Sequence, residues 1–378
     1  GMLRDYGSIE TQSLVARTGP SAPPMRWPAF QLSVMPSYEE VVNPKTGTVK
    51  HVLFSSQWIK HPDHKQLPTI TFRAGAGLVT ISPDGERALN VWSPRAPVVP
   101  PDDWQAQAQP FVEHIQWLWG PQADAFLDFL AHIEQKPGEL PHSGWLHVAP
   151  HEGMGRNWIT SVLVRIWPGG VAVNLTLDEV LGGFNGHRLS RKLLAGIDEV
   201  HADQLRGSKW ATLQKIKTLI TAEQRMVEFK FGAKILEWNA MRWLIYSNHA
   251  DSVPIDKGDR RFNVAQCLDQ PRSPDYYARL YGLVEDKNFQ ASVRHWLAIR
   301  DISAFNPGAR PVMSEAKAGV LRPSQHTNDL VLEALVNGWP CDLIDANTLN
   351  LLVRMEMAEG TEAVAINKHQ LERAGVLT

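Results

Sequence analysis

The sequence predicts an α/β fold with a parallel sheet, and three observations carry this prediction. Residues 145–158 pass from an apolar strand into a glycine-rich loop and then into a helix. Apolar runs and helical patterns alternate after this loop, which is typical of α/β domains. The apolar run Leu193–Ile197 ends in two acidic residues, Asp198 and Glu199. We therefore expect the core of the protein over residues 141–305.

The glycine-rich loop has the spacing of a phosphate-binding loop, but its side chains are altered. The usual pattern is G-x-x-x-x-G-K-S/T: backbone N–H groups bind phosphates, the Lys reaches the terminal phosphates and the hydroxyl binds Mg²⁺. Aligned on Gly155, this chain has Pro150, Arg156 and Asn157 in place of the first Gly, the Lys and the Ser or Thr. The residues expected to contact a nucleotide are Gly153, Met154, Gly155, Arg156, Asn157 and Asp198.

The chain outside the core divides into four regions. We expect a flexible, proline-rich N-terminus at residues 1–48, a small β-containing module with a linker at 49–100, and a helical pair at 101–140. The region 306–378 is expected to be helical, with a winged-helix-like arrangement. Within the core, we expect strands at Leu146–Ala149, Leu193–Ile197 and Met241–Tyr246, and helices at Trp158–Trp167, Trp210–Leu219, Asp275–Glu285 and Asn288–Ile299.

Composition restricts the class of protein. Of the 378 residues, 43% are apolar and 21% are charged, which is enough to build a large core. No run approaches the roughly 18 consecutive apolar residues of a membrane helix, so we expect a cytoplasmic protein that contacts no membrane. Cys267 and Cys341 have no His pair at ligand spacing nearby, so neither a disulfide framework nor a zinc site is predicted. The net charge of −2 disfavours a globally basic nucleic-acid binder but allows local basic patches.

Polar residues follow the predicted strands where a nucleotide hydrolase needs them. Asp198 and Glu199 fit a Walker B element, in which the first carboxylate holds Mg²⁺ through water and the second orients the attacking water. Asn248 follows the next predicted strand and would contact the γ-phosphate or that water. Each pattern also has a plain structural interpretation, namely solvated acids at a strand end and a turn-forming Asn.

Arg260 and Arg261 lie just beyond Asn248 in the sequence. Either residue could act as an arginine finger that reaches the γ-phosphate held by a neighbouring subunit. Adjacent side chains on an extended segment point to opposite sides, so at most one of the two is expected to be the finger. A solvated or ion-paired face is the alternative interpretation.

A basic segment lies between the acidic pair and the strand that precedes Asn248. Between residues 206 and 234, only Glu223 and Glu228 oppose a series of cations. Such a segment can bind the phosphates of single-stranded DNA, and a basic surface without a ligand is the alternative. The DNA contacts expected within it are Lys209, Lys215, Lys217 and Lys230.

In order and spacing, these residues resemble the superfamily 3 helicase-like domain of phage and plasmid primase-helicases, a P-loop NTPase of AAA+-like fold related to the poxvirus primase-helicase ATPase. The resemblance runs from about Trp58 to the C-terminus. By this resemblance Asp198 and Glu199 take the Walker B roles and Asn248 the sensor role. The finger role falls to Arg260 or Arg261, and Lys217 and Lys230 belong to the segment that meets DNA. The matching segments are Ala88–Trp92, 151–157, Lys192–Glu199, Leu213–Lys217, Ser247-Asn248, Asp259–Phe262 and Leu297–Arg310.

The resemblance also implies ligands and partners. It implies ATP and Mg²⁺, hexameric rings with ATP at subunit interfaces, single-stranded DNA in the pore, and a primase or other replication protein as partner. The departures from the family pattern predict weak or absent hydrolysis. Arg156 is a planar fork rather than a compact ammonium, Asn157 lacks the Mg²⁺-binding hydroxyl, and Pro150 removes a loop N–H.

Two other functions fit the sequence. One is a catalytically inactive nucleotide- or DNA-binding scaffold, or a primase accessory module, that keeps the assembly but not the motor. The other is a small-molecule kinase built on the same loop, which the basic segment and the paired Arg residues disfavour.

Overall fold

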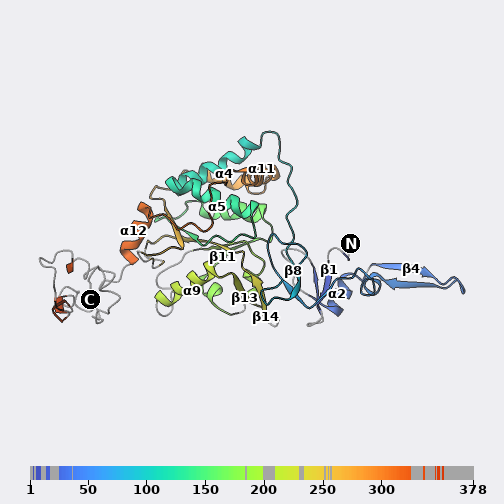
Figure 1. Ribbon diagram of the computed structural model, residues 1–378. Helices are drawn as coiled ribbons and strands as arrows, with labels where there is room; N and C mark the ends of the chain where they lie inside the picture. The colour runs from blue at the N-terminus through green and yellow to red at the C-terminus, as the bar shows by residue number, and fades with distance from the viewer. Residues whose placement is uncertain are drawn as a thin grey trace. The chain divides into compact units, whose positions relative to one another are not determined.

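The computed structural model divides into two compact units, Gly1–His249 with Arg260–Val312, and Ala250–Asp259 with Met313–Thr378. The first unit contains the sheet and the glycine-rich loop, and it is shown with the second in Figure 1. The residues that the structure describes are 3, 6–9, 14–17, 25–35, 37–183, 185–198, 209–229, 234–250, 253, 255, 258–324, 335–336, 345, 347–349 and 351–352.

A five-stranded parallel sheet forms the centre of the first unit. Neighbouring strands all run parallel, and β10 and β15 are buried along their whole length. Continuous burial is what a parallel sheet covered on both faces requires. The α/β prediction is therefore confirmed. In spatial order the strands are β11 (Val171–Leu175), β12 (Leu194–Ile197), β15 (Arg242–Ser247), β10 (Gly144–Val148) and β16 (Phe262–Gln266).

The position of β10 determines where a ligand can bind. β10 comes first in the chain, yet it lies between β15 and β16, so the strand order reverses beside it. In open α/β sheets, ligands bind at the carboxyl ends of the strands at such a reversal. The glycine-rich loop leaves β10 at this edge.

The expected helices are also present, with small shifts of their ends. α4 (Trp104–Trp119) and α5 (Ala123–Gln135) form the predicted helical pair. In Figure 1 these two helices and α11 (Lys287–Ile299) lie on one side of β11, and α9 (Lys209–Thr221) lies on the other. Further core helices are α6 (Arg156–Ile166), α7 (Leu177–Leu181), α8 (Gly186–Leu189) and α10 (Pro274–Leu283). The first turn of α10 is capped by the Ser273 hydroxyl.

Trp119 joins the helical pair to the sheet. Its ring stacks on Phe126 of α5 with centroids 4.1 Å apart and lies 4.4 Å from the imidazole of His147 on β10. His147 Nε2 also lies 3.0 Å from the Leu118 carbonyl, which fixes the end of α4 on the strand. These contacts are completely buried, so they hold the helical pair against the strand that carries the loop.

The N-terminal 48 residues differ from the expectation of a flexible, loosely packed segment. Described parts of this region form secondary structure, and Phe30 is fully buried against Trp58. The proline-rich composition misled because short strands can alternate with prolines and still pack. One sheet consists of β1 (Tyr6–Ile9), β2 (Leu14–Arg17), β3 (Met25–Arg26) and β6 (Gln66–Leu67). The helix α2 (Trp27–Ser33) follows β3. A separate hairpin pairs β4 (Tyr38–Val42) with β5 (Val49–Leu53).

The predicted β-containing module is present beyond this region. A short helix, α3 (Phe54–Trp58), precedes a three-stranded sheet in the order β7 (Thr69–Thr71), β9 (Arg87–Asn90) and β8 (Val79–Ile81). Asn90 fixes the loop between β7 and β8, because its side-chain amide donates to three carbonyls, those of Arg73, Ala76 and Gly77.

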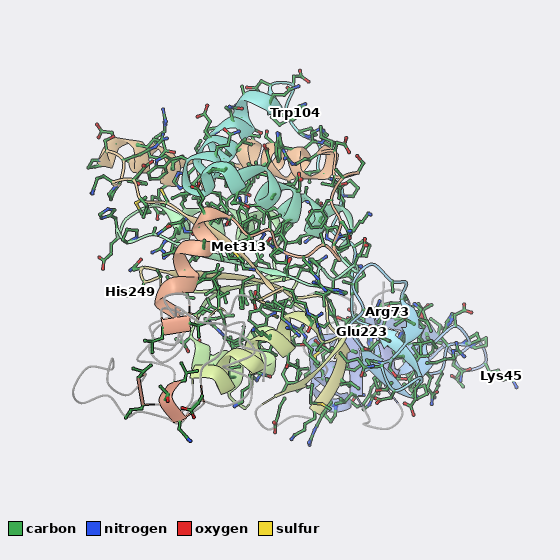
Figure 2. The ribbon with its side chains drawn as sticks, turned by 60° about the vertical axis from the view of Figure 1, so that its left-hand side comes forward. Lys45, Arg73, Trp104, Glu223, His249 and Met313 are labelled. Carbon is green, nitrogen blue, oxygen red and sulfur yellow. The ribbon has the colours of Figure 1, made fainter. Side chains whose placement is uncertain are left out.

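A hairpin that the sequence did not predict begins in the basic segment and ends beyond it, at Trp238. β13 (Gln224–Glu228) and β14 (Lys234–Trp238) pair antiparallel and contact β7, where the Trp238 N–H donates to the Phe72 carbonyl at 3.1 Å. The Arg73 guanidinium lies 4.9 Å from the Trp238 ring. Figure 2 labels Arg73, which follows β7, and Glu223, which precedes β13.

The second unit contains α12 (Glu315–Ser324), which lies in the region 306–378 that was expected to be helical. Lys317 of this helix is buried and donates to the Asp259 carbonyl at 2.8 Å. The helices expected near Asn328–Leu335, Asp345–Met357 and Lys368–Ala374 fall largely outside the described residues. Among the described helices, none combines the length and apolarity needed to cross a bilayer.

We predict that Trp119→Ala lowers the free energy of unfolding by about 3–5 kcal/mol, because it leaves a cavity between α5 and β10. Tyr281→Ala, at a side chain on α10 that is 51% exposed, is the control and should cost less than about 1 kcal/mol. Denaturant unfolding of both variants measures the difference. Equal losses would show that Trp119 does not anchor the helical pair.

Candidate nucleotide site

The loop after β10 turns back sharply into α6. Gly153 and Gly155 have φ angles of 71° and 80°, in the left-handed region that other residues disfavour. Gly155 is the N-cap of α6, so the first backbone N–H groups of the helix face the loop without intrahelical partners. Such a helix end attracts anions through these N–H groups and the helix dipole. Met154, expected among the nucleotide contacts, is buried in the hydrophobic core.

A cavity of about 360 Å³ lies at the carboxyl edge of the sheet. Because β10, β12 and β15 are parallel and in register, the residues that follow them reach the same edge. The structure brings three predicted residues together around this cavity, Arg156, Asn157 and Asp198. Glu199 lies outside the described residues. The other residues that line the cavity are Asn174, Leu175, Thr176 and Tyr246.

Arg156 connects the loop to the end of β15. Its Nη1 donates to the Ser247 carbonyl at 2.9 Å, and its Nη2 donates to the Asn248 Oδ1 at 2.5 Å. The guanidinium also lies 5.6 Å from the centre of the Tyr246 ring. In a standard phosphate loop the Lys at this position points to the phosphates. Here the predicted sensor Asn248 and the predicted phosphate ligand Arg156 contact each other directly.

Asn174 and Thr176 are site residues that the sequence analysis missed. β11 pairs irregularly with β12 between Ala172 and Leu175, and Asn174 has a φ angle of 53°. Asn tolerates this conformation better than other side chains. Thr176 exchanges hydrogen bonds with Glu179, an arrangement that holds the start of the next helix. The short, mostly apolar run Val171–Leu175 after Pro168-Gly169-Gly170 was the signal for this strand.

The donors around the cavity fit a magnesium ion. Asp198 offers a carboxylate, Asn157 an amide oxygen and Thr176 a hydroxyl, and Mg²⁺ prefers oxygen ligands. No group of three or more His, Cys, Asp or Glu side chains converges in the described part of the chain. The residues that could hold this ion together with phosphate groups and water are therefore Asp198, Asn157 and Thr176.

His114 of α4 supports the loop from behind. It is fully buried, and its Nε2 lies 3.2 Å from the Gly155 carbonyl while its Nδ1 lies 3.0 Å from the Tyr276 hydroxyl. A carbonyl only accepts, so Nε2 carries the proton and Nδ1 accepts from the tyrosine. Burial lowers the pKa of His114 to about 4, which keeps the ring neutral near pH 7. The loop is therefore tied through α4 to the first turn of α10.

Arg260 and Arg261 lie at the opposite edge of the sheet. Both precede β16, and the Arg261 carbonyl accepts from the Gly144 N–H at the start of β10. A five-residue strand separates this position from the loop, which is about 13–16 Å. Neither residue therefore reaches the loop of its own chain. Both residues line one cavity of about 290 Å³, so their side chains do not lie on opposite sides as an extended segment would place them.

The basic segment presents fewer cations to solvent than expected. Lys215 is exposed on α9. Lys217 is only 5% exposed, because it lies on the same side of the helix as the buried Ile216 and Ile220. In this structure Lys217 therefore does not offer its ammonium to DNA. The side chain of Lys209 and all of Lys230 lie outside the described residues.

Sequence comparison relates the chain to a phage replication protein. Residues 148–261 match a protein family of unknown function, DUF5906. Over 254 residues, 65% of this chain, the sequence is 26% identical to the DNA primase-polymerase of Nitratiruptor phage NrS-1. The chain spans 34% of the length of that relative.

Solved structures show the same fold. Two apo structures of the NrS-1 C-terminal region match with TM-scores of 0.63 and 0.59 at 18% and 19% identity. The matches cover 97% and 91% of this chain, and 81% and 83% of the solved chains. The chain is therefore similar in fold to the C-terminal region of a phage protein, and similar in sequence to a DNA primase-polymerase.

We predict that Gly155→Ala damages the loop far more than Gly153→Ala. Both positions have positive φ, but an added Cβ at Gly155 would lie 2.7 Å from His114 Nε2, whereas one at Gly153 meets nothing within 4 Å. Both variants should lose about 1 kcal/mol of unfolding free energy from the backbone, and only Gly155→Ala should lose more. Combining Gly155→Ala with His114→Ala should recover part of that excess, and a purely additive double variant would contradict the contact.

Proposed function

We propose that the chain is the ATP-binding, helicase-like part of a phage-type DNA replication protein. The observation that carries this proposal is the convergence of three strand ends on one cavity. The loop after β10, Asp198 after β12 and Asn248 after β15 all reach the carboxyl edge of the sheet. The similarity to a phage DNA primase-polymerase supports a role in replication.

In this proposal the nucleotide phosphates bind at the start of α6. The N–H groups from Gly153 to Asn157 face the phosphates, and the helix dipole favours their charge. Asp198 and Asn157 would hold Mg²⁺, whose role when bound is to neutralise charge on the phosphate oxygens. Glu199, the next residue, is proposed to orient the attacking water.

We propose that hydrolysis is slow because of Arg156 and Asn157. The Arg156 guanidinium is directed at Ser247 and Asn248, so turning it toward a γ-phosphate breaks two hydrogen bonds at the end of β15. The Asn157 backbone carbonyl accepts from the hydroxyls of Thr160 and Ser161, but its side chain supplies an amide where the family has a hydroxyl. Both phosphate-facing side chains therefore differ from those of an efficient hydrolase.

The proposed active form is a ring of six copies, as the resemblance implies. Nucleotide binding itself does not require the ring, but the position of the arginines supports it. Arg260 and Arg261 lie at the edge opposite their own loop, so either could act only on the nucleotide of a second copy. Single-stranded DNA would contact the exposed Lys215, together with Lys209 of the same basic segment and, as the resemblance implies, Lys230. A primase or other replication protein is the proposed partner.

A nucleotide- or DNA-binding scaffold is the second candidate, and one observation favours it. Arg156 and Asn248 satisfy each other, so the two groups that should sense a γ-phosphate are already paired. A scaffold would keep this pair when nucleotide binds, whereas a motor must open it.

We predict that the purified chain hydrolyses ATP more slowly than about 1 s⁻¹, the low end of ordinary enzyme turnover. The double variant Arg156→Lys with Asn157→Ser should raise the rate at least tenfold, because it restores the ammonium and the hydroxyl. Adding Asp198→Asn to the double variant is the control and should abolish the gain. A fast wild-type rate that Asp198→Asn removes would refute the weak-hydrolysis proposal. A double variant that hydrolyses ATP no faster than wild type would favour the scaffold.

We predict that Lys215→Gln weakens binding of single-stranded DNA and lowers the salt dependence of binding by about 0.7 in the log–log slope, the value for one phosphate contact. Lys45→Gln, at the exposed turn of the β4–β5 hairpin, removes the same charge elsewhere and should leave the slope unchanged. Fluorescence anisotropy with labelled oligonucleotides at several salt concentrations measures both. Equal slopes for the two variants would exclude α9 from the DNA site.

A further inference from the structure

A β-bulge at the end of β11 places Asn174 at the cavity on the carboxyl edge of the sheet. Between two aligned pairs, β11 has two residues, Val173 and Asn174, where β12 has only Gly196. Asn174 has a φ angle of 53° and lines the cavity of about 360 Å³. Bulges redirect side chains and are frequent beside active sites. Because this backbone conformation is unfavourable for a residue with a Cβ, other interactions must hold it.

Arg188 of α8 holds the bulge. Its Nη2 donates to the carbonyls of Val173 and Asn174, each at 3.0 Å. Its Nε lies 3.9 Å from Glu179 Oε1, and the Oε2 of the same carboxylate accepts from the Thr176 backbone N–H at 2.9 Å. The backbone on both sides of Asn174 is therefore fixed from α8. The Asn174 side-chain amide itself makes no hydrogen bond to any other residue that the structure describes, so a ligand in the cavity can reach it.

Asn174 lies beside Asp198, on the side of the cavity away from the glycine-rich loop. The Asp198 N–H donates at 3.3 Å to the carbonyl of Leu175, the residue that follows Asn174. β11 is also the strand beyond β12, and neighbouring strands lie about 4.8 Å apart. Phosphates that begin at the N–H groups of α6 and extend past Asp198 therefore end near Asn174.

The amide of Asn174 can take the role predicted for Asn248. The Asn248 Oδ1 already accepts from Arg156, so this residue must break a hydrogen bond before its side chain can turn to a phosphate. An Asn side chain has two N–H donors on Nδ2. Hydrogen bonds from such donors to a charged phosphate oxygen are roughly twice as strong as those between neutral groups. Asn174 can donate one without breaking a hydrogen bond of its side chain to another described residue.

We propose that the Asn174 amide donates to the terminal phosphate of the bound nucleotide, and that Arg188 is its positioning residue. This inference rests on the proposed nucleotide site and gives that site a preference for a nucleoside triphosphate over a diphosphate. A diphosphate keeps the phosphates at the start of α6 but lacks the group that reaches Asn174. The alternative is that Asn174 is present only because Asn tolerates a positive φ angle.

Asn174→Gly separates these two explanations, because glycine adopts a positive φ angle freely and has no amide. Affinities for a non-hydrolysable ATP analogue and for ADP, each with Mg²⁺, are measured by isothermal titration calorimetry. The variant should bind the analogue at least fivefold more weakly than wild type and bind ADP within twofold. Its urea midpoint should equal or exceed that of wild type, because the backbone strain is relieved. Asn43→Gly, in the exposed turn between β4 and β5, is the matched control and should change neither affinity.

Arg188→Gln tests the positioning role. It should lower the preference for the analogue over ADP at least threefold, because the bulge loses two hydrogen bonds. Arg188→Lys keeps the charge and should show a smaller loss, and Arg87→Gln, at the exposed start of β9, should show none. Added to Asn174→Gly, Arg188→Gln should cause no further loss of preference, because the amide that it positions is gone.

Three results would overturn the proposal and leave the proposed nucleotide site standing. The first is a wild-type chain that binds the analogue and ADP equally well. The second is an Asn174→Gly variant that binds the analogue as tightly as wild type, and the third is a variant that loses affinity for both nucleotides equally. A wild-type chain that binds neither nucleotide refutes the proposed nucleotide site itself, and this inference with it.

Discussion

The position of β10 between β15 and β16 is the constraint on which the rest of the structure depends. This strand is hydrogen-bonded on both edges and buried on both faces, so the loop that follows it emerges at a fixed point on the carboxyl edge. Parallel pairing brings Asp198 and Asn248 to the same edge. The same pairing sends Arg260 and Arg261 to the opposite edge, because they precede a strand parallel to β10. The strand order therefore separates the cavity lined by Arg156, Asn157 and Asp198 from the cavity lined by Arg260 and Arg261.

The loop is held by contacts from three directions, and each limits how it can move. His114 contacts the Gly155 carbonyl from α4, Arg156 contacts the end of β15, and the left-handed glycines set the turn between them. A Lys in place of Arg156 has no planar fork with which to bind two acceptors on β15. In the standard loop the Lys side chain contacts the phosphates, whereas Arg156 contacts the protein at the end of β15. This exchange is the physical reason for the slow hydrolysis that we propose.

Much of the core could be predicted from the sequence, because long apolar runs and helical spacing report burial directly. The strands before Asp198 and Asn248 and the helical pair were found in this way. β11 and β16 were missed because each has a polar Asn that interrupts its apolar run. The burial of Lys217 and the contacts of His114 could not be predicted, because both depend on which side of a helix packs on the sheet. Arg310 lines the same cavity as Arg260. The sequence could not indicate this, because the turn that carries Arg310 is fixed by a hydrogen bond from the distant His142 N–H to the Pro307 carbonyl.

The most direct test of the account is a crystal structure of the chain grown with a non-hydrolysable ATP analogue and Mg²⁺. The account predicts phosphate density at the N–H groups of residues 153–157, with a metal ion beside Asp198 and Asn157. Density at another place, or a loop that stays empty at saturating nucleotide, would contradict the claim that this cavity is a nucleotide site.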